Sequence, residues 1–320
     1  DPGAEDTLAA ADVIWRQSAN TWLKLEKGVS TGPGGAAYGS NDGGFSFTPT
    51  TATNDPASTT PVPDSGHHGA TRVDGSLDLK DVYQAANGQL TFYHQAVDGG
   101  YAAPGAMALT DVNQSGASLK TALTDKVDLR AKMDKRNQDL SLETSALEVD
   151  ADYKLDDHWK LSSGVRKDSR TDHSPVVPAT QVQGDRTDVV VRAGYDSQAS
   201  WSAYGYAQDT ASTSGNRDQN SRVGAGGAYR LSDRFRINGE LSGGDNGVGA
   251  QLGSEYLLSD KTTTYLNYAL ENERTDNGVL ANKGTTSAGA RSKVSDTTSV
   301  FGEERYTQGD VPEGLLHSAG

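Results

Sequence analysis

The chain has 320 residues, among which there is no cysteine and no long apolar run. The absence of cysteine excludes a disulfide framework, a cysteine-ligated zinc site and a thiol nucleophile. Because no stretch approaches 18 consecutive apolar residues, the sequence contains no candidate transmembrane helix. Its first residues carry neither the basic start nor the apolar core of an export signal, so we expect a mature form or a segment of a longer protein.

Basic residues are also scarce, since the chain has 29 of them against 43 acidic residues and a formal net charge of −14. Nucleic acid is not expected as a partner, because phosphate contacts need a basic surface. Hydrophobic residues make up only 34% of the chain, whereas glycine reaches 37 residues. Such a composition suits either a disordered chain or an all-β fold whose apolar surface is one-sided.

The alternation of apolar and polar residues favours an all-β fold over a disordered chain. From Val127 to Met133, aliphatic residues and methionine alternate with aspartate, arginine and lysine. A period of two is typical of β-strands, and helical spacing fits such segments less well. Comparable segments occupy residues 147–155, 159–166, 189–195, 223–231, 235–241 and 266–271. We therefore expect an all-β fold.

Two kinds of connection alternate between the predicted strands. Short corners with Asp and Ser suit tight turns, because these side chains bond nearby backbone groups. They lie at residues 123–127, 155–159, 195–201, 231–235, 258–262 and 294–299. Longer, irregular connections lie at residues 168–188, 210–221, 271–284 and 307–314, and the longest is a Gly/Thr/Pro-rich loop at about 30–69. The pattern predicts an antiparallel up-and-down β-barrel of roughly 16 strands, with short turns at one end and long loops at the other, as a single domain over residues 1–320.

Aromatic residues flank the predicted short turns. The residues concerned are Trp15, Trp22, Tyr153, Trp159, Tyr195, Trp201, Tyr229 and Phe235. Rings gathered at one end of a strand array are typical of a membrane–water interface, and we interpret these residues as interfacial aromatics. In a soluble hairpin protein the same rings would instead close the end of a core, and this alternative remains open.

The polar face of the predicted strands carries too many charges to pack as a core. These charged residues are Arg130, Lys132, Asp150, Lys154, Arg166, Arg192, Arg230, Arg236, Glu240 and Glu271. A barrel of about 16 strands encloses a water-filled lumen, which hydrates such charges while the apolar face meets lipid. We therefore predict that the strands are transmembrane and that these charges face the lumen. The net acidity of the chain predicts a mild preference for cations.

Several segments resemble a known family. They are "GDRTDVVVRAGYDSQASWSAYGYAQDT", "GAGGAYRLSDRFRINGELSGGD", "TYLNYALENERTDNG" and "EERYTQGDVPEGLLHSAG". They are similar to the C-terminal β-barrel region of very long proteobacterial outer-membrane surface proteins, most closely over residues 185–320. The resemblance implies an outer-membrane barrel but carries over no biochemical activity residue by residue.

The sequence offers little for catalysis. We find none of the motifs of serine hydrolases, zinc proteases or nucleotide-binding folds. We place His67 and His68 in the long Gly/Pro-rich loop and expect no metal there, and we expect no cofactor. Asp172 and His173 leave a barrel-embedded hydrolase as a weak alternative. The prediction is that the protein is not an enzyme.

Two classes of function remain. The first is an outer-membrane β-barrel in contact with the lipid bilayer, which acts as a passive pore for small ions or solutes or as the membrane anchor of a larger surface protein. The second is a soluble, secreted or surface-displayed β-structure used for adhesion or assembly, with the long loops as its contact surface. A protein that folds without detergent would belong to the second class and not to the first. The oligomeric state does not follow from the sequence.

Overall fold

The computed structural model describes residues 7–31, 38–39, 48–49, 66–103, 106–108, 110–177, 181–274, 280–310 and 313–320. Within these residues, seventeen strands have six or more residues. They are β1 (Thr7–Arg16), β2 (Trp22–Thr31), β5 (His67–Asp78), β6 (Gly88–Val97), β9 (Val112–Thr124), β10 (Val127–Gln138), β11 (Leu142–Lys154), β12 (Trp159–Asp172), β13 (Gly184–Asp196), β14 (Trp201–Thr213), β15 (Arg222–Ser232), β16 (Phe235–Gly244), β17 (Gly247–Ser259), β18 (Thr262–Arg274), β19 (Leu280–Lys293), β20 (Ser299–Gly309) and β21 (Gly314–Ala319). The shorter elements are β3 (Tyr38–Gly39), β4 (Thr48–Pro49), β7 (Ala102–Ala103), β8 (Ala106–Met107) and the 3-10 helix η1 (Leu79–Asp81). Among the described residues, no helix is long and apolar enough to cross a membrane.

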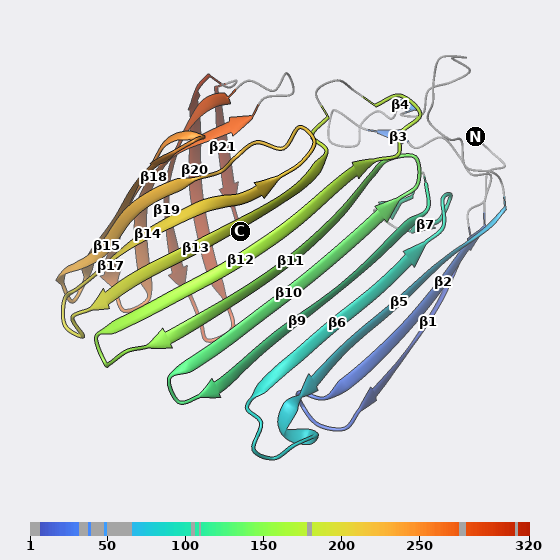
Figure 1. Ribbon diagram of the computed structural model, residues 1–320, viewed down its shortest axis with the longest axis horizontal. Helices are drawn as coiled ribbons and strands as arrows, with labels where there is room; N and C mark the ends of the chain where they lie inside the picture. Colours follow the sequence, from blue (N-terminus) through green and yellow to red (C-terminus); the bar gives the residue numbers. More distant parts are fainter. Residues whose placement is uncertain are drawn as a thin grey trace. The chain divides into compact units, whose positions relative to one another are not determined.

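The chain forms two compact units. Unit 1 comprises Asp1–Val149 and Lys167–Asp185, and unit 2 comprises Asp150–Arg166 and Arg186–Gly320. In unit 1, β1, β2, β5, β6, β9 and β10 pair in that order, each antiparallel to the next. In unit 2, the strands from β13 to β21 pair in chain order in the same way. Figure 1 shows the consecutive strands of each unit side by side, which confirms the predicted up-and-down topology.

The connections differ between the two ends of each unit. In unit 1, residues 125–126 form a tight turn between β9 and β10, whereas at the opposite end β6 ends at Val97 and β9 begins only at Val112. In unit 2, the turn at 233–234 and the loop at 214–221 show the same contrast. The loop end also contains a short turn, at residues 245–246, where the Gly/Asp-rich sequence closes a tight hairpin between β16 and β17.

Aspartate side chains stabilise the short turns, as the sequence predicted. The Asp156 carboxylate accepts hydrogen bonds from the backbone N–H groups of His158 and Trp159, at 2.8 and 2.7 Å. In the next turn of this end, Asp196 accepts one from the Gln198 N–H at 2.7 Å. Each carboxylate satisfies backbone donors that have no ladder partner in the turn, and this explains why aspartate recurs there.

In unit 1, the strand register sorts side chains onto one polar and one apolar face. On one face, Glu26, Arg72, Gln95, Gln114 and Arg136 lie directly opposite one another across β2, β5, β6, β9 and β10. On the other face, the matching row is Leu23, Gly75, Phe92, Ala117 and Met133. Since successive side chains point to opposite sides of a strand, the alternation of the sequence becomes two chemically distinct surfaces.

Unit 2 has the same division. One row across β14 to β17 contains Tyr204, Gly226, Glu240 and Gln251. The opposite face carries large apolar side chains that are more than half exposed, among them Val191, Leu241, Leu252 and Leu266. No other layer of the described unit covers this face, and apolar exposure on this scale is unusual for a protein surface in water.

Tyrosines on the polar face lie across glycines of the neighbouring strand. The pairs in direct register are Tyr93 with Gly116, Tyr204 with Gly226 and Tyr265 with Gly289. A Cβ atom at Gly226 would lie 2.6 Å from the Tyr204 hydroxyl and 2.7 Å from the Gly239 carbonyl oxygen. Only a residue without a side chain leaves room for the ring, and this accounts for glycine in the middle of these strands.

We predict that Gly226→Ala lowers the free energy of unfolding by about 1–3 kcal/mol, because the added methyl group overlaps both Tyr204 and the Gly239 backbone. Gly243→Ala is the matched control, since a Cβ atom there meets no atom within 4 Å. Denaturant unfolding of the two variants measures the difference. Equal stabilities would contradict the proposed packing of the ring.

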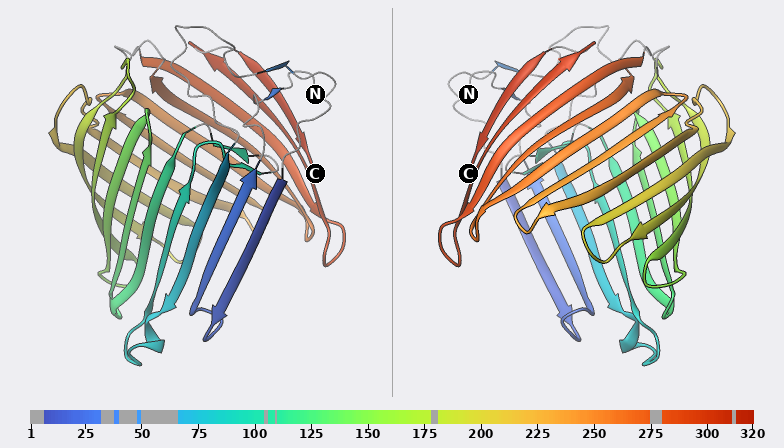
Figure 2. Two further views of the ribbon diagram at one scale, coloured as in Figure 1. Left: turned by 90° about the vertical axis from the view of Figure 1, so that its right-hand side faces the viewer. Right: turned by 90° about the vertical axis from the view of Figure 1, so that its left-hand side faces the viewer.

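At the turn end of unit 1, helix η1 is tied to the β1–β2 turn (Figure 2). The Asp81 carboxylate accepts hydrogen bonds from the hydroxyls of Thr21 and of Ser18, the latter at 2.9 Å. These two bonds lower the pKa of Asp81 below its ordinary value of 3.8, because they favour the ionised carboxylate.

The stabilisation from Asp81 is therefore present at neutral pH and is lost as the pH falls through its lowered pKa. We predict that Asp81→Asn unfolds at lower denaturant concentration than the wild-type chain at pH 7, and that the difference shrinks as the pH is lowered below about 4. Unfolding midpoints over this pH range provide the measurement. A difference that is independent of pH would show that the carboxylate charge plays no part.

Candidate functional site

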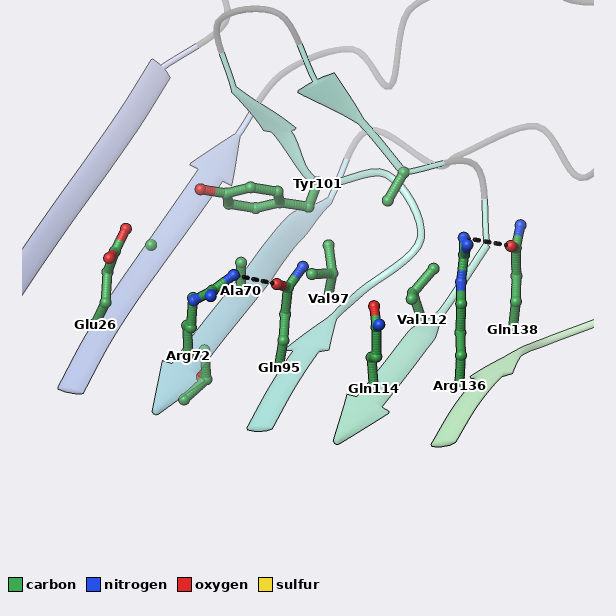
Figure 3. Close-up of a pocket in the computed structure, with 13 residues that line it drawn as sticks. Glu26, Ala70, Arg72, Gln95, Val97, Tyr101, Val112, Gln114, Arg136 and Gln138 are labelled. Carbon is green, nitrogen blue, oxygen red and sulfur yellow. Dashed lines mark hydrogen bonds between the residues drawn. The ribbon is translucent and has the colours of Figure 1, made fainter. Parts of the chain in front are cut away.

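A cavity of about 590 Å³ opens on the polar face of unit 1 (Figure 3). Its walls are two adjacent rows of side chains in direct register across β2, β5, β6, β9 and β10. The first row consists of Glu26, Arg72, Gln95, Gln114 and Arg136, and the second of Gly28, Ala70, Val97, Val112 and Gln138. The cavity therefore has polar groups along one side and a mainly apolar floor along the other.

Arg72 is held rigidly in this row. Its Nε and Nη2 atoms donate to the two carboxylate oxygens of Asp74 at 2.7 and 2.8 Å, and Nη1 donates to Gln95 Oε1 at 3.0 Å. A planar guanidinium paired with a carboxylate in this two-pronged way is well ordered. Its charge is neutralised locally by Asp74.

Arg136 lies at the other end of the row and has a different environment. Within the described residues, its single hydrogen bond runs from Nη2 to Gln138 Oε1 at 3.0 Å. Gln138 in turn donates to the Thr110 hydroxyl at 3.2 Å. The side chain is exposed, and its positive charge is paired with a neutral amide rather than with a carboxylate.

Tyr101 covers part of the cavity from the long connection between β6 and β9. Figure 3 shows its ring lying across the tops of the strands, above Ala70 and towards Glu26. The glycine at position 28 makes room for it, since a Cβ atom there would lie 2.5 Å from the Tyr101 hydroxyl. The connection is fixed beside β2 by a hydrogen bond from the Ala102 N–H to the Ser30 hydroxyl at 3.0 Å.

A second polar cluster lies on the polar face of unit 2. Both Tyr204 and Tyr206 donate their hydroxyls to the Glu240 carboxylate, the second at 3.0 Å. The Arg192 guanidinium lies over the Tyr204 ring, 3.7 Å from its centroid. Cation, ring and carboxylate thus form one connected group, and each member restricts the others.

The ten charged residues expected at the lumen all lie on the polar face of the strand that carries them, as the period of two requires. The structure brings some of them together. Arg230 and Arg236 are directly opposite each other on β15 and β16, with Glu255 opposite Arg236 on β17. Arg192 and Glu240 meet through Tyr204. Arg130 and Lys132 lie on the face that carries Arg136.

Of the predicted interfacial aromatics, Trp159, Tyr195 and Trp201 form one cluster at the turn end of unit 2. The Tyr195 ring meets Trp159 edge to face, with centroids 5.1 Å apart, and lies tilted against Trp201 at 5.0 Å. Trp15 lies in register with Leu23 on the apolar face of unit 1. Trp22 differs, because its register partner is Ser76 and it shares the polar face with Lys24.

The sequence alone did not single out the cavity. The separate segments "LEKG", "TRVD", "HQAV", "NQSG" and "KRNQ" contain most of its polar residues, but nothing in them indicates that Arg72 and Arg136 belong to one row. That row depends on cross-strand register, which a single strand does not reveal. The only available signal was the parity of each residue within its strand.

The residues considered for catalysis or metal binding lie in or beside strands and have structural contacts. The placement of His67 and His68 in the long loop was wrong, because they begin β5 and pair in register with Thr31 and Ser30. His173 Nε2 is 3.1 Å from Glu143 Oε2, and Lys135 Nζ is 2.7 Å from the other oxygen of that carboxylate. Asp172 accepts a hydrogen bond from the Ser174 N–H at 2.8 Å. Among the described residues, no cluster of three or more His, Asp or Glu side chains is arranged to hold a metal ion.

No protein-family model and no curated protein matches the chain, but solved structures do. The FrpB iron transporter of Neisseria meningitidis (F3-3 variant) has a TM-score of 0.57 at 10% identity, covering 95% of this chain and 60% of that chain. OccK3 (OpdO) of Pseudomonas aeruginosa has a TM-score of 0.46 at 11% identity, covering 99% and 94%. OccK11 (OpdR) of the same organism has a TM-score of 0.45 at 8% identity, covering 99% and 92%.

This chain thus spans 60% of the length of the transporter that it matches. The likeness to that transporter confirms the predicted fold class: the chain has the antiparallel up-and-down fold of transmembrane β-barrels. At sequence identities near 10%, the likeness supports the fold but no function.

We predict that Tyr204→Phe lowers the free energy of unfolding by about 1.5–3 kcal/mol, the usual contribution of a hydrogen bond to a charged group. The substitution keeps the ring beside Gly226 and under Arg192, and removes only the hydroxyl that donates to Glu240. Tyr256→Phe is the control, since within the described residues its hydroxyl has no partner. If both variants unfold alike, the hydrogen bond to Glu240 contributes nothing.

Proposed function

We propose that the chain is part or all of a bacterial outer-membrane β-barrel through which small ions or solutes pass passively. In this proposal residues 1–320 act as a single barrel domain, with the polar face of the strands towards the aqueous path and the apolar face towards lipid. The observation that supports it most directly is the separation of the two faces by strand register in both units.

The apolar face suits a lipid environment for energetic reasons. Side chains such as Leu241 and Leu252, which are 68% and 63% exposed, would remain in contact with water in a soluble protein. Removing apolar surface from water contributes roughly 25 cal/mol per Å², so a membrane around this face stabilises the fold. Most of the backbone would also be satisfied inside a membrane, because β2, β5, β6 and β9 in unit 1 and β14 to β20 in unit 2 each pair with a strand on both sides.

The cluster of Trp159, Tyr195 and Trp201 supports a membrane boundary at the turn end. Trp159, Tyr195 and Trp201 lie beside the turns at 155–158 and 197–200, where the apolar face ends. Tryptophan and tyrosine favour the headgroup region because one edge of each ring is apolar and the other forms hydrogen bonds. The turn end would therefore lie at one membrane surface.

Anchoring of a larger surface protein is the second candidate. It is favoured by the resemblance of residues 185–320 to the barrel region of very long outer-membrane proteins. An anchor needs the same apolar face but no open path for solutes. Conductance therefore distinguishes the two functions.

We predict discrete single-channel conductance when the folded protein is inserted into a planar lipid bilayer. Lys132→Glu, which reverses a charge on the polar face, should shift the reversal potential in a salt gradient towards cations. Lys135→Glu on the opposite face of β10 makes the same change of charge and should leave the reversal potential unchanged. Bilayers that contain the protein but show no channel events would exclude the pore and leave the anchor. Equal shifts in both variants would contradict the assignment of the two faces.

A further inference from the structure

The cavity of unit 1 has a charge imbalance located at one residue. Around it, Lys24 pairs with Glu26 at 2.8 Å, and Arg72 pairs with Asp74 at 2.7 Å. Arg136 forms no ion pair among the described residues, because Asp134, the acidic residue next to it on the same face of β10, accepts a hydrogen bond from Tyr93 instead. Guanidinium groups in this state attract carboxylates, which they bind through two parallel N–H donors.

A ligand of this cavity must carry a carboxylate for Arg136, and the floor of the cavity adds a second requirement on that ligand. Ala70, Val97 and Val112 form an uncharged strip next to the polar row, and Tyr101 covers the end near β2 (Figure 3). An apolar strip below an aromatic ring suits a compact body with one apolar side, such as a sugar ring. A fully hydrated inorganic ion gains nothing from such a surface.

The side-chain amides of Gln95 and Gln114, which lie between the two arginines, add a third requirement on the ligand. Gln95 uses its Oε1 for Arg72 and keeps its Nε2 donor towards the cavity, whereas Gln114 uses its Nε2 for the Tyr93 hydroxyl and keeps its Oε1 acceptor. A donor and an acceptor on neighbouring strands match hydroxyl groups, which both donate and accept. Their partners fix both amides in orientation before any ligand arrives.

We propose that this cavity binds a small hydroxylated carboxylate of the size of a hexuronate. The carboxylate contacts Arg136, the hydroxyls contact Gln95 and Gln114, and the ring lies on Val97 and Val112 beside Tyr101. The volume of about 590 Å³ lies within the range of small-molecule sites and leaves room for such a ligand with water. The assignment rests on the proposed function and deepens it, because it names a solute that the path would bind at one site although the net acidity of the chain favours cations overall.

Calorimetric titration of the detergent-solubilised, folded protein tests the assignment, with glucuronate, glucose and inorganic phosphate as probes at constant ionic strength. We expect saturable binding of glucuronate, and binding at least about tenfold weaker for glucose, which lacks the charge, and for phosphate, which lacks the ring. Arg136→Gln should weaken glucuronate binding by about tenfold to a hundredfold. The matched control is Arg130→Gln, on the same face of β10 but outside the cavity lining, and it should stay within about twofold of wild type.

Three results would overturn the proposal. They are the absence of saturable glucuronate binding by the folded wild-type protein, equal affinities for glucuronate and either other probe, and equal losses in the two arginine variants. Since binding is measured at equilibrium without a membrane, its outcome is independent of conductance. A protein that binds glucuronate but shows no channel events keeps the site and loses the pore, and the reverse result loses only the site.

Discussion

The antiparallel register is the constraint on which the rest of the structure depends. Each strand satisfies its backbone groups with its neighbours, and the same pairing fixes which side chains share a face. A shift of one residue in β10 would move Arg136 to the apolar face and Met133 to the polar one. The two surfaces, the cavity and the aromatic cluster therefore all depend on register, and so does the compatibility of the fold with lipid.

The polar face is not a loose array of charges. Tyrosines bridge neighbouring strands over glycine and end on a carboxylate: Tyr93 reaches Asp134, Tyr204 reaches Glu240, and Tyr265 reaches Glu303. Each bridge spans three strands in direct register, and it binds the sheet on the side where hydrophobic packing is absent. A wide polar face gains order in this way without an apolar core, at the cost of placing glycine in strand interiors.

The sequence predicts the strands and the two faces of each strand, but it does not predict which residues of different strands lie side by side, for a physical reason. Alternation in "VDLRAKM" places Arg130 and Lys132 on one face because parity is a local property of a strand. Parity does not align strands, so the row that joins Arg72 to Arg136 and the rings over glycine could not be predicted. Trp22 was grouped with aromatics near turns by its position in the chain, but its parity places it beside Lys24. The turn at 245–246 is as short as those at the turn end, but it lies at the loop end because β16 runs towards that end; there the Asp245 carboxylate accepts a hydrogen bond from the Ser221 N–H at 2.8 Å.

The central claim is that the apolar face requires lipid or its substitute, and the most direct measurement is the fold of the purified chain with and without detergent. Circular dichroism reports the secondary structure, and gel mobility before and after boiling reports whether the chain forms a compact, heat-sensitive fold. We expect a β-type spectrum and a heat-dependent shift in mobility in detergent micelles, and neither in plain buffer. A compact, monomeric β-protein in plain buffer would contradict the account, and the charged face would then be the ordinary wet face of a soluble protein.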